Sequence, residues 1–322
     1  MDQQQQRQQQ QRQEKLASFL AGISSGSLAS VVCAPLDLVR TRLQVQGSML
    51  SELKEEMGFS RMFRDIIRND GLVGCFRGLT PTLACVPIFW GIYFPIYEFS
   101  KPHFIKLYYG ENIHNVTDNH ASSPLVSLSS AIFAGAIADV LVNPMFLVRT
   151  RMQTESLHYF VEHKEMPQLT MRQTIASLYN EGGGNLLIFW RGLTASMLGL
   201  SHVGIQFPTY EYFKAVARRR NDSNEESAAD LLVASGLSKL CACAATYPHE
   251  VVRSRVMDLR GENAVSMTDT VKSIVKEEGW MGLYRGLHIS LIRVVPNCCL
   301  TFISYELTLR WIRENILQKP GF

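Results

Sequence analysis

The chain has 322 residues, of which 46% are hydrophobic and 19% charged, and its net charge is +3. So small a charge excludes nucleic-acid binding by bulk electrostatics, and it excludes a disordered acidic chain. The seven cysteines include no CxxC pair, so the sequence predicts neither a metal site nor a disulfide scaffold. No cofactor is predicted either.

Residues 1–13 form a glutamine tract that contains Arg7 and Arg12. Its low complexity predicts a disordered tail. The tract lacks the apolar core of a secretory signal and makes a poor amphipathic transit peptide. Targeting to an organelle is therefore expected to depend on internal features of the chain.

Six apolar stretches follow, and each is long enough to cross a membrane. Two carry no charged residue, and four carry only isolated ones; they are 16–36, 79–97, 125–148, 193–210, 231–247 and 287–305. A spanning helix needs about 20 mostly apolar residues, so the pattern predicts an all-α membrane protein with six transmembrane helices. The alternative is a soluble all-α protein with six buried helices, which rarely repeats uncharged runs of this length.

A threefold repeat organises these stretches. Three of them end in a proline followed by a basic cluster: APLDLVRTRLQ from Ala34, NPMFLVRTRMQ from Asn143 and YPHEVVRSRVM from Tyr247. Each cluster is followed by an acidic residue with a glycine, an Arg-Gly pair, and a second span that closes on Tyr-Glu. The three helix–loop–helix repeats cover 14–110, 124–220 and 221–322, and a polar linker occupies 111–123.

The repeated prolines are Pro35, Pro144 and Pro248. A proline inside a spanning helix removes a backbone hydrogen bond and kinks the helix, so three kinks can bring three helix ends together under a central cavity. Two and five residues after each proline stand the members of what we call the proline-end network: Asp37, Arg40, Phe146, Arg149, Glu250 and Arg253. An acid of one repeat can meet a base of the next and close the cavity. For a single copy, the alternative is a helix-end charge that snorkels to the interface.

The triple Pro-x-Asp/Glu-x-x-Arg pattern, with the Arg-Gly motif between spans, resembles the mitochondrial carrier family from Leu16 to Arg313. The resemblance implies six tilted helices in a pseudo-threefold bundle, short helices on the matrix side, and one central substrate site with alternating access. It makes the proline-end network a matrix gate that pairs Asp37 with Arg149 and Glu250 with Arg40. In the third link Phe146 replaces the acid, which leaves its ring as a cation–π partner for Arg253.

Two further sets of residues follow from the resemblance. The glutamines that brace the gate match at Gln44 and Gln153, whereas Met257 stands at the third position. The second set, which we call the tyrosine-end network, is the cytoplasmic gate and comprises Glu98, Lys101, Glu211, Lys214 and Glu306. Leu309 stands where the last base is expected, and whether the next residue, Arg310, replaces it is left open.

Three lone charges lie inside the apolar spans: Asp139, Lys239 and Arg293. A charge at bilayer depth costs roughly 2.5–3.5 kcal/mol, so such a residue usually faces a cavity and serves function. By helical periodicity, Asp139 lies above Phe146 and Lys239 above Glu250 on the inward faces of their helices. Asp139 and Lys239 either pair with each other or bind the solute. The two cations suit an anionic, phosphate-bearing solute.

The resemblance narrows the substrate. The family's contact positions, counted seven residues from each Arg-Gly glycine, are Cys85, Gly199 and Arg293. The pair Gly199-Leu200 is the family's pattern for nucleotide-like substrates, where the missing side chain leaves room for a flat base. Trp90 offers an aromatic face for stacking. Two residues on one face of the fourth span either hydrogen-bond a base or ribose or pack against a neighbouring helix: His202 and Gln206.

The runs SHVGIQFPTYE and YPHEVVR look most like the NAD carriers, within a branch that also carries pyrimidine nucleotides, folate and FAD. The resemblance therefore implies an antiporter that exchanges NAD⁺ for AMP, ADP or a related nucleotide. It places the chain in the mitochondrial inner membrane, with plastid or peroxisomal membranes as alternatives. It also implies a monomer in contact with membrane lipid, including cardiolipin. A substrate-gated proton leak is the alternative of another class, and no motif suggests an enzyme.

Overall fold

The computed structural model describes residues 2–49, 57–110, 123–161, 170–220, 228–260 and 266–317, and the regular elements within these ranges are helices. The predicted linker, apart from its last residue, lies outside the described residues. The long helices are α1 (Asp2–Val45), α3 (Leu79–Tyr109), α5 (Pro124–Val161), α7 (Leu193–Gly199) with α8 (Ser201–Arg220), α9 (Ala228–Asp258) and α11 (Leu287–Ile312). Three shorter helices connect them in pairs: α2 (Phe59–Gly74), α6 (Met171–Glu181) and α10 (Met267–Glu278).

Six helical segments of the described chain are long and apolar enough to cross a membrane, as predicted. They are Leu20–Val45, Leu79–Tyr109, Pro124–Tyr159, Leu186–Arg218, Asp230–Asp258 and Trp280–Asn315. Large apolar side chains stand on their outer surfaces, as Leu232 and Phe302 do, each 74% exposed. Such a surface is costly in water but is the surface that lipid requires.

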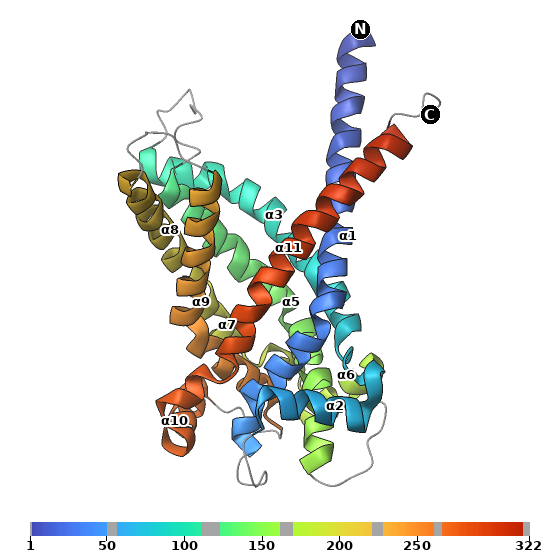
Figure 1. Ribbon diagram of the computed structural model, residues 1–322, viewed down its shortest axis with the longest axis vertical. Helices are drawn as coiled ribbons and strands as arrows, with labels where there is room; N and C mark the ends of the chain where they lie inside the picture. The colour runs from blue at the N-terminus through green and yellow to red at the C-terminus, as the bar shows by residue number, and fades with distance from the viewer. Residues whose placement is uncertain are drawn as a thin grey trace.

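The long helices form one bundle (Figure 1), and the contacts between them follow the expected threefold order. Its closest helix contacts join neighbouring repeats: α3 packs on α5, α8 on α9, and α11 on α1. The connecting helices α2, α6 and α10 lie at the end of the bundle opposite both termini, with α2 running across that end (Figure 1). The fold is thus an all-α bundle of three helix–loop–helix repeats.

The buried apolar residues gather into three clusters at the end where the connecting helices lie. One joins α1 to α2 through Leu38, Val39 and Ile66. The second joins α9 to α10 and includes Val251 and Ile274, and the third joins α5 to α6 and includes Leu147 and Leu178. The protein is therefore packed most firmly at the proline end, whereas its spans face lipid on one side.

The glycine of each Arg-Gly pair starts the second span of its repeat from a left-handed conformation. Gly78 has φ +78° and Gly192 φ +77°, values that residues with a side chain rarely adopt. A Cβ at Gly78 would lie 2.7 Å from Gln153 Cγ, and one at Gly192 would lie 2.9 Å from Met257 Cγ. Both glycines therefore also permit close approach to the next repeat, at the bracing positions of its first helix.

Two details differ from the sequence-based predictions. Residues 2–13, predicted to be disordered, form the first turns of α1. Glutamine is a good helix former, and a helix already nucleated by the first span extends at little cost. The fourth span is divided in two, because Leu200 interrupts the helix between α7 and α8. The break falls at the Gly199-Leu200 pair.

Candidate functional site

The proline-end network joins three helices that each contain an internal proline, Pro35 in α1, Pro144 in α5 and Pro248 in α9. Arg40 of α1 forms an ion pair with Glu250 of α9. Arg149 of α5 forms one with Asp37 of α1, at 3.4 Å between Nη2 and Oδ2. Both are pairs that the family pattern predicts. They tie α1 to each of the other two helices.

In the third link, no carboxylate of the described part of the chain contacts Arg253. Arg253 instead lies over the ring of Phe146, with Cζ 4.8 Å from the ring centroid, which confirms the predicted cation–π contact. Its Nε and Nη2 are buried without a hydrogen-bond acceptor among the described residues. An unpaired buried donor costs roughly 1–3 kcal/mol, so this link is the weakest of the three.

The braces form a second ring with the same threefold order. Thr41 donates to Gln153 Oε1 at 2.9 Å, and Ser254 donates to Gln44 Oε1 at 2.7 Å. At the third position the hydroxyl of Thr150 contacts Met257 Sδ at 3.6 Å. Since thioether sulfur is a weak acceptor, the brace between α5 and α9 is the weaker one. It lies beside the link that lacks an acid.

The structure also contains three buried ion-pair clusters, one in each repeat, which the sequence analysis did not predict. The second arginine of each basic cluster holds the acid that precedes the loop glycine: Arg42 with Asp70, Arg151 with Glu181 and Arg255 with Glu278. The arginine of each Arg-Gly pair adds a second contact to the same acid: Arg77, Arg191 and Arg285. These clusters fasten each connecting helix to the span before it. The signal was present, because all nine residues recur at matched positions of the repeats.

Arg293 lies against the proline-end network. Its Nη1 is 3.0 Å from Oδ1 of Asp37, whose other oxygen faces Arg149. One carboxylate is therefore shared by Arg149 of the proline-end network and Arg293, the predicted phosphate ligand. In this conformation four arginines meet at the proline end of the bundle: Arg40, Arg149, Arg253 and Arg293. Among the described residues, the acids that contact them are Asp37 and Glu250.

Lys239 does not pair with Asp139 in this conformation. Its ammonium donates to His202 Nε2 at 2.9 Å and lies 3.4 Å from Gln206 Oε1. His202 Nδ1 is 3.2 Å from the hydroxyl of Thr246, so this ring is held from both sides. The structure therefore brings three predicted substrate residues together between α8 and α9. Asp139 is 9% exposed and stands apart from this cluster.

The space expected beside Gly199 is occupied. A Cβ at Gly199 would lie 2.7 Å from Nε2 of His249, so this imidazole takes up the room that the glycine leaves. Leu200 packs in the same way against Gly135, at 2.7 Å from the position of a Cβ there. The first contact position, Cys85, is fully buried. A flat base at Gly199 would therefore contact His249, a residue that sequence reasoning missed.

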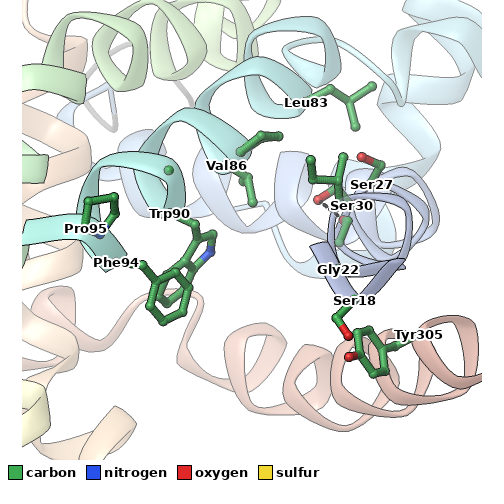
Figure 2. A pocket seen from close by; sticks show the side chains of 14 residues that line it. Ser18, Gly22, Ser27, Ser30, Leu83, Val86, Trp90, Phe94, Pro95 and Tyr305 are labelled. Atoms are coloured by element: carbon green, nitrogen blue, oxygen red, sulfur yellow. Dashed lines mark hydrogen bonds between the residues drawn. The ribbon is translucent and has the colours of Figure 1, made fainter. Parts of the chain in front are cut away.

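Trp90 borders a cavity of about 610 Å³ between α1 and α3. Figure 2 shows small residues of α1, such as Gly22 and Ser30, on one side and Trp90 and Phe94 on the other. The rings of Trp90 and Phe94 are stacked, with centroids 5.3 Å apart. Trp90 is 47% exposed, so its indole can receive a planar partner.

The tyrosine-end network differs from the proline-end network. Lys101 pairs with Glu98 of its own helix at 3.1 Å and covers the ring of Tyr97. Glu306 pairs with Arg310, one turn further along α11, at 2.5 Å. These two pairs run along single helices and join no helix to its neighbour. Glu211 is exposed, and Lys214 lies one turn further on in α8.

The family pattern described as "Mitochondrial carrier protein" matches residues 11–108, 120–221 and 224–315, one match for each repeat. The chain belongs to this family. It is 35% identical over 306 residues to mitochondrial substrate carrier family protein W of Dictyostelium discoideum, covering 94% of this chain and 88% of that protein.

Two further relatives of the carrier are named for a substrate. The chain is 34% identical to the mitochondrial nicotinamide adenine dinucleotide transporter 1 of Saccharomyces cerevisiae, and the match covers 89% of this chain and 74% of the relative. It is 31% identical to the chloroplastic nicotinamide adenine dinucleotide transporter 1 of Arabidopsis thaliana, covering 94% and 93%. The relatives are transporters, so the chain is a carrier of small molecules and not an enzyme.

Proposed function

We propose that this carrier is an antiporter for nucleotide-type cofactors, with NAD⁺ exchanged for AMP, ADP or a related nucleotide, in the mitochondrial inner membrane. The observation that carries the proposal is the excess of arginine over contacting acids at the proline end of the bundle. Four arginines lie there against two contacting acids, and Arg40, Arg149, Arg253 and Arg293 each keep at least one buried donor without an acceptor among the described residues. Phosphate oxygens satisfy such donors well.

The proposed binding mode assigns each part of the solute to a neighbouring group. Arg293 and Lys239 take the phosphates, His202 and Gln206 take a base or ribose, and His249 lines the base site beside Gly199. Trp90 stacks on a planar ring. The names of two relatives, as nicotinamide adenine dinucleotide transporters, support NAD⁺ as the first substrate to test.

The shared carboxylate supplies a route from binding to transport. A phosphate at Arg293 competes with Asp37, and Asp37 is also the partner of Arg149. Weakening that contact loosens the link between α1 and α5, so the energy of solute binding offsets the cost of opening. A ligand shifts a conformational equilibrium only by its differential affinity for the two states, and this competition provides one.

The test is uptake of labelled NAD⁺ into liposomes that hold the purified protein and are preloaded with AMP, ADP, UTP or nothing. We expect uptake to require an internal nucleotide. It should be lost in Arg293→Ala and reduced in Lys239→Ala, but kept in Arg68→Ala, which removes an exposed arginine of α2. Exchange of other nucleotides but not of NAD⁺ would mean that the carrier has a different nucleotide substrate. Exchange of no nucleotide would refute the proposal.

The weak third link favours one second candidate, a substrate-gated proton leak on the same scaffold. Such a leak predicts proton conductance that depends on a nucleotide although no labelled nucleotide moves. Parallel recording of internal pH in the same liposomes separates the two functions.

A further inference from the structure

We propose that Asp139 acts as the displaced third acid of the proline-end network, balancing Arg253 from two turns above the position where Phe146 replaces an acid. This inference rests on the alternating-access transport proposed above, but not on which nucleotide is carried. It makes Asp139 a positioning residue that acts through Arg253.

The first support is the geometry of α5. Asp139 and Phe146 are seven residues apart in one continuous helix, so they share a face and are separated by roughly 10 Å along its axis. Arg253 reaches from α9 onto that same face, because its guanidinium lies over the Phe146 ring at 4.8 Å. The two charges therefore meet one stripe of α5, the cation at the ring and the carboxylate above it.

The second support is that neither Arg253 nor Asp139 forms an ion pair with another of the described residues. Arg40 and Arg149 contact acids, whereas Arg253 contacts a ring and keeps two buried donors unpaired. Asp139 is nine-tenths buried, and within the described ranges no cation lies in ion-pair distance of it. The other cation that the sequence offered, Lys239, is occupied by His202.

The third support is the balance of charge around Arg253. Arg253 shares the proline end of the bundle with three other arginines: Arg40, Arg149 and Arg293. The acids of the described chain that make contact there, Asp37 and Glu250, pair with those three arginines and not with Arg253. An isolated buried charge is expensive, so a counter-charge at this range is worth retaining even without contact.

The displacement has a consequence for gating. In the other two links the acid and base touch and exclude the solute. In the third, the acid is set back toward the predicted substrate site, and an aromatic ring occupies the contact. A phosphate can therefore approach Arg253 without first separating an ion pair. The link between α5 and α9 should be the first to yield.

A charge-relocation experiment tests the inference. Asp139→Asn keeps the shape of the side chain but removes its charge, and Phe146→Asp in that background returns an acid to the contact position. The matched control is Asp269→Asn, which removes an acid of α10 whose side chain is 64% exposed. The assay is release of labelled AMP from proteoliposomes without external nucleotide, beside AMP exchange.

We expect Asp139→Asn to raise uncoupled release about tenfold, which corresponds to about 1.4 kcal/mol of gate closure. The double variant should return release close to that of the unmodified protein, and the control should not change it. If Asp139→Asn left the uncoupled release of AMP unchanged, that result would overturn the inference. So would a variant that only raises KM for one nucleotide and is not rescued by Phe146→Asp, because that result makes Asp139 a solute ligand.

A second readout separates this inference from the proposed function. If the unmodified protein exchanges no nucleotide, the proposed function fails, and thermal unfolding in detergent then decides the role of Asp139. Asp139→Asn should lower the melting temperature, and Phe146→Asp in the same protein should restore it. Failure of the relocated acid to restore stability would overturn the inference, because a merely structural role of Asp139 cannot be rescued from position 146.

Discussion

The buried acids that fasten the connecting helices provide the sharpest test of the fold. Glu278 ends α10, and its side chain is fully buried. It accepts from Arg255 Nη2 at 2.8 Å, and Arg285 Nε lies 2.7 Å away. We expect Glu278→Gln to destabilise the protein strongly, because the substitution leaves two arginines largely buried without their counter-charge.

The structure sets the size of the effect. Removing one partner of a buried ion pair costs about 3–5 kcal/mol. At about 2–4 °C per kcal/mol for a chain of this length class, the melting temperature should fall by roughly 6–20 °C. The neighbouring Glu277→Gln is the matched control: Glu277 is exposed and accepts from Ser273 of its own helix, so its loss should cost less than about 0.5 kcal/mol.

Thermal unfolding of the purified protein in detergent, followed by tryptophan fluorescence, measures both variants. Equal shifts for Glu277→Gln and Glu278→Gln would refute the reasoning, since the two differ in burial and partners but not in chemistry. The threefold order adds a further requirement. Glu181→Gln should resemble Glu278→Gln, because Glu181 holds Arg151 at 2.9 Å and Arg191 at 3.0 Å.

Two other outcomes follow from close packing and burial. Gly199→Ala should lower the free energy of unfolding by about 1–3 kcal/mol, because the added Cβ meets the His249 ring. In a His249→Ala background the same substitution should have little effect. Equal losses of stability in the two backgrounds, measured as melting temperatures, would contradict the contact. Burial raises the pKa of the Cys75 thiol, so its thiolate fraction at mildly alkaline pH is reduced. Iodoacetamide at that pH should therefore label Cys75 much more slowly in the folded protein than after unfolding in denaturant, as peptide mass spectrometry can show, and equal rates would contradict the burial.

The repeat made much of the structure predictable. Matched positions in three copies are related by one rotation, so a pairing that is sensible for one repeat is sensible for all. The pairs Arg40–Glu250 and Asp37–Arg149 are the ones that the family resemblance implies, and the contact of Arg253 with Phe146 stands at the third of the matched positions. The same argument would have found the clusters around Asp70, had the recurring second arginine been traced to the loop acid.

The contacts of the predicted substrate residues were harder to foresee, because these residues do not recur in the three repeats. Nothing in helical periodicity says that Lys239 reaches His202 across to α8 instead of Asp139, or that His249 fills the space beside Gly199. Those outcomes depend on how far apart neighbouring helices stand, which is set by packing along their whole length.

Arg293 belongs both to the predicted substrate residues and to the surroundings of the proline-end network, so the two sets cannot be treated separately. As a lone charge in an apolar span it is predicted as a phosphate ligand, whereas in the structure its guanidinium is held by Asp37 of the proline-end network. Both descriptions hold for one residue if binding and gating use the same charge. A carboxylate shared by Arg293 and Arg149 cannot keep its full interaction with either when an anion arrives, because the anion competes for the same donors. In the proposed mechanism, the asymmetry of the predicted substrate residues thus reaches, through Asp37, a network that is otherwise nearly symmetric.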